Sequence, residues 1–424
     1  MNAGLIVIIL LLVLSILGIP IYLALGIGTL VALNMADMPF IVLPQKLFAG
    51  MNSSSLLAIP FFMLAGNIMS RSITGKLIDV SNALIGWIKG SLAVVTVLAS
   101  ALFGAISGSG VATASAVGGT TIPAMKEEGY PDHFAAAISG IAAILGPIIP
   151  PSITLIVYAS ITDLSVSKLF VGSVIPGILM AGGLIIYALF YGKKNDLPAH
   201  ERKSAKEVLS IFKDSIWALL MPVIILGGIF GGIFTATESA AVAVVYALLV
   251  SLLIYKDIKI KDIPGIFVDG AISTATILML VGISKSSGYV ITTSGLPHQV
   301  LEVFSSFTNS TVVILLLLNI LFLVIGMLME ANAAIIMMTP ILLPLLNAFG
   351  IDPLQFGIMM SFNLCIGLVT PPVGLCLLMT NQIAGARFVQ TLKSVLPMLL
   401  IGVVVRMLVT YIPQVTPFLP GLIK

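Results

Sequence analysis

Two serines and two glycines interrupt a long apolar stretch of the sequence and could bind a cation. Ser107, Gly108, Ser109 and Gly110 follow one another between two apolar runs. Glycine lets the backbone turn and leaves carbonyl oxygens free, while serine hydroxyls add oxygen ligands without burying a charge. Hard cations are bound by oxygens of these kinds. The segment therefore predicts a sodium site at the tip of a helical hairpin, and close helix packing on small residues is the alternative.

Prolines break the next apolar stretch, where further ligands could come from the backbone. Three of the five residues from Pro147 to Pro151 are prolines, and Ser152 follows them directly. An α-helix cannot continue through such a run, so carbonyls near Gly146, Ile149 and Pro150 are predicted to join the sodium site. Ser152 is predicted to cap the half-helix beyond the break, where its hydroxyl and the positive helix end favour a carboxylate. A helix that is simply kinked is the alternative.

The same pattern of prolines and glycines recurs 221 residues later in the chain. Pro123, Gly129, Gly146, Pro150, Pro151 and Pro176 recur as Pro344, Gly350, Gly367, Pro371, Pro372 and Pro397. Four of these pairs are prolines, whereas chance would align roughly half a pair over windows of this length. Matching breaks in a duplicated membrane segment point to a transport site, because irregular backbone is tolerated at membrane depth only where it is buried or lines a cavity. The sequence therefore favours a secondary transporter.

The second copy predicts a sodium site of its own. The residues that would form it flank the second hairpin tip and the second break: Gly326, Gly367, Thr370 and Val373. Glu330, at the second tip, is the only acid in a long apolar stretch, and an intramembrane carboxylate is a functional candidate by default. It could bind a cation, carry a proton, or bond to Asn332 and hold the tip in place.

Four polar residues at the tips and breaks are predicted to contact substrate: Ser107, Ser152, Asn332 and Asn363. Ser107 and Ser152 would hold a carboxylate between them. Asn363 is equally able to donate to the substrate or to the backbone. No second titratable group is placed to complete a catalytic pair with Glu330, so an enzyme is not expected.

The composition of the chain is typical of an integral membrane protein. Of its 424 residues 59% are hydrophobic and 9% charged, and the mean hydropathy is +1.18. A soluble domain is nearer a quarter charged, so we expect an all-α polytopic protein in a lipid bilayer. The net charge of +3 is too small and dispersed for a nucleic-acid partner. No phosphate-binding P-loop motif is present, so an ion gradient or a partner chain must supply energy for uphill transport.

The basic residues predict how the elements are oriented. Lysines and arginines gather in the segments 193–213 and 256–261, which are therefore placed in the cytoplasm. Counting crossings from these segments puts the N-terminus in the cytoplasm and the C-terminus in the periplasm, and makes the two repeats inverted. Each repeat would contain a re-entrant hairpin and a broken helix. The segments 77–88 and 259–270, too short to span, are predicted to lie along the interface as amphipathic arms.

These expectations divide the chain into four segments. They are first scaffold helices and an interfacial arm (1–89), a first transport repeat (90–192), a cytoplasmic loop with second scaffold helices and arm (193–310), and a second transport repeat (311–424).

Several motifs resemble the large membrane subunit of tripartite ATP-independent periplasmic (TRAP) transporters. The resemblance runs through the whole chain and is carried by PFFMLAGN at 60–67, SGS at 107–109, GPIIPPS at 146–152 and TESAAVA at 237–243. It implies an elevator-type fold with scaffold and transport domains, a bacterial inner-membrane location, a smaller membrane subunit and a periplasmic substrate-binding protein as partners. It also implies import of organic acids with at least two sodium ions. The sodium and carboxylate sites of the family carry over to Ser107, Ser109, Ser152, Gly326, Gly367 and Thr370.

The chain departs from the family pattern near the first tip. Many relatives have an aspartate shortly after the first tip, in a VAD pattern, where this chain reads Val111-Ala112-Thr113, so an acid there is not required.

A sparsely charged membrane midplane suits a monocarboxylate such as sialic acid (N-acetylneuraminate). A subunit for C4-dicarboxylates, or a stand-alone sodium symporter of the divalent-anion type, is the alternative.

Overall fold

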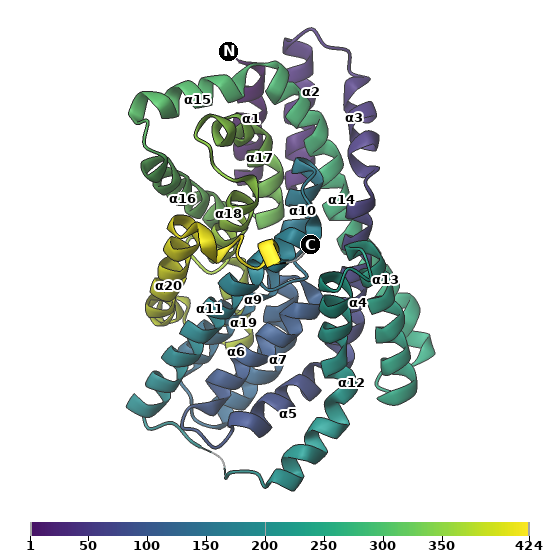
Figure 1. Cartoon of the computed structure of the whole chain (residues 1–424), viewed down its shortest axis with the longest axis vertical. Coiled ribbons are helices and arrows are strands. Elements are labelled where there is room, and N and C mark those ends of the chain that lie inside the picture. The colour runs from purple at the N-terminus through teal and green to yellow at the C-terminus, as the bar shows by residue number, and fades with distance from the viewer. Residues whose placement is uncertain (1, 200, 423–424) are drawn as a thin grey trace.

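The computed structural model describes residues 2–199 and 201–422, and all the regular structure in these residues is helical (Figure 1). Eight of the described helices are long and apolar enough to cross a membrane, or nine if one bent pair counts as a single span. The predicted class, an all-α polytopic membrane protein, is confirmed.

The repeat seen in the proline spacing extends to the helix boundaries. The helices of the two hairpins and the first halves of the broken helices are α6 (Ser91–Ser107), α7 (Gly110–Glu127), α8 (Asp132–Ala143), α16 (Thr311–Leu328), α17 (Ala331–Ala348) and α18 (Pro353–Gly367). The ends of α6 and α16, the starts of α7 and α17, and the starts of α8 and α18 are each 221 residues apart. The duplication therefore covers whole structural units and not only isolated prolines.

Both predicted helix breaks are present. In the first repeat α8 continues into the short α9 (Leu145–Ile148), the chain runs extended to Ser152, and α10 (Ile153–Thr162) completes the span. In the second, α19 (Leu375–Ala384) follows α18 after a loop. The bonds Pro150–Pro151 and Pro371–Pro372 are cis in both breaks. Long helices, α11 (Val166–Lys194) and α20 (Phe388–Tyr411), end the two repeats.

Seven further helices lie outside these repeats. They are α1 (Ala3–Ile16), α2 (Ile21–Met35), α3 (Val42–Met51), α4 (Ala58–Ser72), α12 (Ala205–Phe230), α13 (Ala236–Leu249) and α14 (Ile263–Thr293). In the first half α3 meets the helical segment that contains α4 at a bend of 64°. The corresponding stretch of the second half is the single uninterrupted helix α14, so the two halves differ at this point.

One of the two predicted interfacial arms is wrong. α5 (Thr74–Ile85) agrees with the first arm, but residues 259–270 are a 3-10 turn, Ile260–Asp262, and the first turns of α14. Pro264 lies in the first turn of α14, where its missing N–H leaves no bond unmade, so it starts the helix instead of ending it. The counterpart of α5 is α15 (Leu296–Phe307), and Figure 1 places these two short helices at opposite ends of the molecule.

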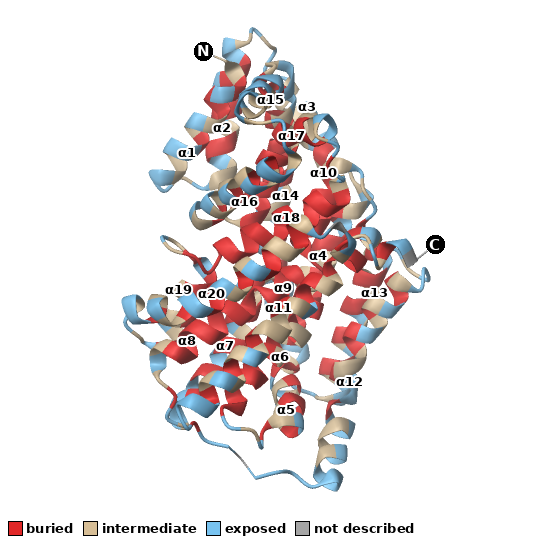
Figure 2. Cartoon of the chain, turned by 60° about the vertical axis from the view of Figure 1, so that its left-hand side comes forward, coloured by how far each residue is buried: buried red, intermediate tan, exposed pale blue. Residues whose placement is uncertain are grey.

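The broken helices form the centre of the protein. Every residue from Phe134 to Ala143 in α8, and every residue from Leu354 to Gly367 in α18, is buried. Figure 2 shows the buried residues concentrated around these helices, while the outer helices expose much of their surface. Among the exposed side chains are large apolar ones such as Val223 and Ile272, as a lipid solvent allows. The first break is buried as well, from Pro150 to Ser152, whereas Pro372 in the second break is exposed.

Candidate transport site

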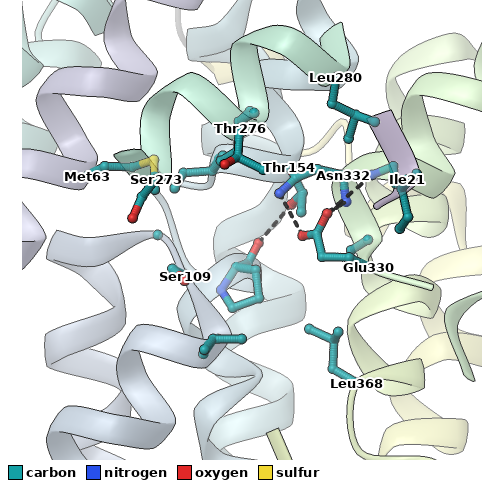
Figure 3. A pocket seen from close by; sticks show the side chains of 18 of the residues that line it. Ile21, Met63, Ser109, Thr154, Ser273, Thr276, Leu280, Glu330, Asn332 and Leu368 are labelled. Carbon is teal, nitrogen blue, oxygen red and sulfur yellow. Dashed lines mark hydrogen bonds between the residues drawn. The ribbon is translucent and has the colours of Figure 1, made fainter. Parts of the chain in front are cut away.

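The two hairpin tips and the first helix break meet at one cavity of about 510 Å³ (Figure 3). Tip one contributes residues 108–111 and tip two residues 330–333. The break contributes Pro147, Ile153 and Thr154, and α2, α4 and α14 close the opposite wall. In Figure 1 hairpin one occupies the lower half of the molecule and hairpin two the upper half, so they approach the cavity from opposite sides. This is the arrangement expected of inverted repeats.

Tip one gathers oxygen atoms next to the broken helix. The Thr113 hydroxyl donates to the Ser109 carbonyl oxygen at 2.7 Å and lies 3.4 Å from the Ser107 hydroxyl. A Cβ atom on Gly146 would lie 2.6 Å from Thr113 Oγ1 and 2.7 Å from the Ser109 oxygen, so only glycine lets the break come so close. The structure thus brings Ser107, Ser109 and Gly146 together as predicted. Sequence reasoning missed Thr113, whose only signal was its place after the tip, in the Val111-Ala112-Thr113 segment where many relatives carry an acid.

The other two residues predicted for this site lie along the break. The Ile149 side chain packs against Gly177 of α11, and Pro150 is buried beside it. The carbonyl oxygen of Pro151 faces tip one, 2.5 Å from where a Cβ on Gly108 would lie. Because Gly108 also has a φ of +61°, two independent features require glycine at this turn.

Ser152 holds the break together. Its hydroxyl donates to the Pro147 carbonyl, which the Thr154 hydroxyl also reaches, and accepts the Leu155 N–H at 3.3 Å. The predicted cap of α10 is therefore confirmed, but Ser152 is fully buried and does not line the cavity. Thr154, which sequence reasoning missed, does line it, and also lies 2.7 Å from the Ser361 hydroxyl of α18.

Glu330 caps tip two in the way that Ser109, 221 residues earlier, caps tip one. Its Oε2 accepts the N–H groups of Asn332 and Ala333 at 3.0 and 3.2 Å, and its Oε1 accepts the Asn332 amide at 2.7 Å. Of the three predicted roles, bonding to Asn332 and holding the tip is the one that the geometry displays. The carboxylate also lines the cavity (Figure 3). Asn332 is 7% exposed, and its Oδ1 has no hydrogen-bond partner among the described residues.

The second predicted sodium site brings its two glycines into contact. A Cβ on Gly367 would lie 2.5 Å from both Cα and the carbonyl oxygen of Gly326. Thr370 lies on the loop beyond Gly367, where its hydroxyl donates to the Ile366 carbonyl at 2.8 Å. Val373, half-buried on the same loop, occupies the position equivalent to Ser152.

Asn363 lies in a different cluster from the one predicted. Its amide donates to the Met359 carbonyl oxygen at 2.9 Å, which is the backbone alternative of the prediction, and to Asn319 of α16 at 2.8 Å. Its Oδ1 accepts from Arg406 of α20 at 3.2 Å. It is fully buried and does not line the cavity. This polar cluster joins α16 to α18 and α20, and nothing in the spacing of its residues revealed it.

Comparison with known proteins decides the family. The model of the tripartite ATP-independent periplasmic transporter, DctM component, matches residues 8–415. The chain belongs to this family. It is 40% identical over 379 residues to the C4-dicarboxylate TRAP transporter large permease protein DctM of Pseudomonas aeruginosa, covering 89% of this chain and 88% of that protein. It is 34% identical over 380 residues to the sialic acid TRAP transporter large permease protein SiaM of Vibrio cholerae, covering 89% of each.

The fold of this TRAP large permease has a solved structural counterpart. The YdaH transporter of Alcanivorax borkumensis, described as having an unusual topology, superposes with a TM-score of 0.62 over 89% of both chains. The sequence identity is 14%, so the likeness shows the fold alone.

Several helix N-termini face the cavity of this TRAP permease, and no basic side chain is among the described residues that line it. Among the described residues that line it, Glu330 is the only charged one. The first residues of α7, α10 and α17 all face the cavity, as does the start of α2, which no side chain caps. Helix N-termini present free N–H groups and the positive end of the helix dipole, so together they favour an anion.

Replacing Ser152 by alanine should lower uptake by the TRAP permease at least about tenfold while the protein still folds. The change removes the cap of α10, worth about 1 kcal/mol, and loosens the first turn of a helix that lines the cavity. Thr154 still reaches the Pro147 carbonyl at 3.3 Å, which preserves the break. Uptake would be measured in proteoliposomes, with elution volume as the folding control. Ser165→Ala, which removes the cap of α11 outside the site, should transport normally. Normal uptake by Ser152→Ala would exclude Ser152 from the site.

Proposed function

We propose that this TRAP permease subunit imports an organic carboxylate together with sodium ions. The observation that carries the proposal is the meeting of two hairpin tips, a helix break and several helix N-termini at one cavity whose described lining holds no cation. An anion is attracted there by backbone dipoles. Its remaining charge needs mobile cations, and the oxygen cluster at tip one is built from ligands that suit sodium.

At least two sodium ions are proposed, one for each tip. The first would be bound at Ser107, Ser109, Thr113 and the break near Gly146. The second would lie where Gly326 and Gly367 touch, with oxygens from the loop that carries Thr370. Sodium binding would order the tips and complete the substrate pocket, which couples the two ligands through their effect on one conformation.

Alternating access is proposed to occur by an elevator movement. The hairpins and broken helices would move as a transport domain against a scaffold that includes α1–α4 and α12–α14. The four segments proposed from the sequence, 1–89, 90–192, 193–310 and 311–424, correspond to these parts. A multi-pass location in the bacterial inner membrane follows from the family and the apolar spans. The distribution of basic residues supports a cytoplasmic segment 193–213 and a periplasmic C-terminus. Asn2 bonds to Ser294 and Gln299 beside α15, at the opposite end of the molecule from that segment (Figure 1), so we propose a periplasmic N-terminus in place of the cytoplasmic one that the crossing count predicted.

Membership of a tripartite family supports two partners. These are a smaller membrane subunit and a periplasmic binding protein that delivers the substrate. Sialic acid is the substrate that we propose, because a polyhydroxylated monocarboxylate suits hydroxyls, the free Asn332 oxygen and helix ends. A C4-dicarboxylate is the second candidate, favoured by the 40% identity to the Pseudomonas protein of that name.

Uptake of radiolabelled N-acetylneuraminate and succinate into proteoliposomes would test this function. The chain would be reconstituted with its smaller subunit, with and without the binding protein and an inward sodium gradient. Uptake that requires both supports the proposal. Uptake that needs sodium but no binding protein would favour a stand-alone symporter, and uptake without sodium would contradict sodium coupling. Uptake of succinate alone would replace the proposed substrate.

A further inference from the structure

A second cleft lies beside the cavity, and two lysines face it. It encloses about 400 Å³ between α3 and α14 on one side and α10 and α17 on the other, and its lining includes Lys46, Lys285 and Tyr289. Within the part of the chain that the structure describes, no acidic residue lines it. The cleft is therefore a region of net positive charge at the border between the proposed scaffold and transport domains.

Both lysines have neutral partners. The Lys285 ammonium donates to the Ser160 carbonyl oxygen at 3.1 Å, in the last turn of α10, and its stem crosses α3 at Gly50. The Lys46 ammonium lies 4.4 Å from the centroid of the Tyr289 ring. A carbonyl and an aromatic face lower the energy of a cation but do not neutralise it. Neither lysine takes part in an ion pair within the described residues.

The cleft continues the transport cavity along the same helices. On α14, Leu280 lines the cavity and Ser284, one turn later, lines the cleft. On α17, Ala333 lines the cavity and Ile336 lines the cleft. The two spaces touch opposite ends of α10, whose ten residues span about 15 Å. The cleft and the cavity therefore lie along the same three helices, α10, α14 and α17.

We infer that this cleft is a second anion site, in which Lys46 and Lys285 bind the carboxylate of an incoming substrate before it enters the cavity. That the natural occupant is the transported carboxylate rests on the function proposed above; the selectivity for anions rests on the two lysines alone. The crossing count places the end of α10 and the cleft toward the extracytoplasmic side, where an importer receives its substrate. The Lys285 ammonium then gives up its hydrogen bond to the Ser160 carbonyl and binds the carboxylate of the substrate instead. When the lysine bonds to Ser160 again, the substrate is released toward the cavity.

Charge-selective labelling tests the site without any substrate. Ala49 is exposed and lines the cleft, whereas Ser167 lines a separate pocket beside Lys168. Ala49→Cys and Ser167→Cys would each be made in the full chain with its smaller subunit. Each would be treated with a methanethiosulfonate reagent bearing a sulfonate and with one bearing a trimethylammonium group. The native Cys365 and Cys376 are buried, and the parent chain measures their background.

The anionic reagent should react faster at position 49, with a preference about tenfold larger than at position 167, because two lysines attract one reagent and repel the other. Adding Lys285→Gln should reduce that preference about threefold, and millimolar N-acetylneuraminate or succinate should slow labelling. Equal preferences at the two positions, or a preference unchanged by Lys285→Gln, would overturn the site.

Uptake kinetics distinguish lysines that bind an anion from lysines that only support the structure. Lys46→Gln and Lys285→Gln should each raise the substrate concentration for half-maximal uptake about tenfold while the maximal rate stays within about twofold. Among the described residues the Lys46 ammonium interacts with the Tyr289 ring and makes no hydrogen bond to α10, so its effect would not come from a lost helix cap. Lys168→Gln is the matched control and should change neither quantity. A lower maximal rate with unchanged half-saturation would make the lysines structural. If the wild type transports neither acid but position 49 still selects the anionic reagent, the proposed function fails while the cleft remains an anion site.

Discussion

Replacing Gly367 by alanine should reduce transport at least about a hundredfold. The added methyl group would lie 2.5 Å from backbone atoms of Gly326, far inside van der Waals contact. Backbone cannot move aside as a flexible side chain can, so hairpin two and the second broken helix must separate. Because the second proposed sodium site lies at this contact, both sodium binding and closure of the tip would be lost. The measurement is sodium-driven uptake in proteoliposomes at equal amounts of reconstituted protein.

Gly119→Ala is the matched control for this substitution. Gly119 is an exposed residue of α7, and a Cβ there meets no atom within 4 Å. Alanine at that position should transport normally and, as the better helix former, stabilise the protein by up to about 1 kcal/mol. Wild-type uptake by Gly367→Ala would mean that the two backbones do not approach as described.

Replacing Thr113 by valine should remove the part of the sodium stabilisation that comes from the first proposed sodium site. The change keeps the shape of the side chain and removes the hydroxyl that joins the Ser109 carbonyl, the Ser107 hydroxyl and the Gly146 region. A ligand that binds only the folded state at a hundred times its dissociation constant adds about 2.7 kcal/mol. Sodium should therefore raise the thermal midpoint of the wild type above that in choline, and the variant, which keeps the second proposed site, should show a clearly smaller rise. Uptake should fall with the loss of the ion.

Thr121→Val provides the comparison within the same helix. The Thr121 hydroxyl donates to the carbonyl four residues earlier, at 3.0 Å, as that of Thr113 does, but it lies two turns away from the tip. This variant should lose the same type of hydrogen bond and keep the sodium response. An undiminished response in Thr113→Val would exclude the threonine as a ligand.

Much of the architecture was predictable because backbone breaks leave a mark on the sequence. Proline and glycine restrict or free the chain whatever the surrounding packing, so their spacing revealed both tips, both breaks and the duplication. The same local chemistry identified Ser152 as a cap. Gly326 and Gly367 were grouped in one predicted site, although their direct contact was not predicted.

The errors arose where long-range packing decides. Thr113 and Thr154 read as ordinary hydroxyl residues within helices, and only the folded chain brings their oxygens to the break and the cavity. Asn363 had the right chemistry for a substrate contact, but packing against α16 and α20 uses its amide elsewhere. The polar segment 259–270 was taken for a separate arm because periodicity alone does not show where a long helix begins. The amphipathic helix that does correspond to α5 is α15, and the short connection after α14 concealed it in the sequence.

The bend between α3 and α4, with no equivalent in α14, means that the two halves of the chain are unequal copies. Two identical inverted halves would give inward-facing and outward-facing forms of the same free energy, as a balance with equal arms has no preferred side. In the proposed elevator movement, the two forms of this protein would place different helices against the moving parts. A difference of about 1.4 kcal/mol between them already sets their populations at about ten to one. Under the proposed mechanism, the unequal halves would therefore favour one of the two orientations even without an ion gradient or a bound ligand.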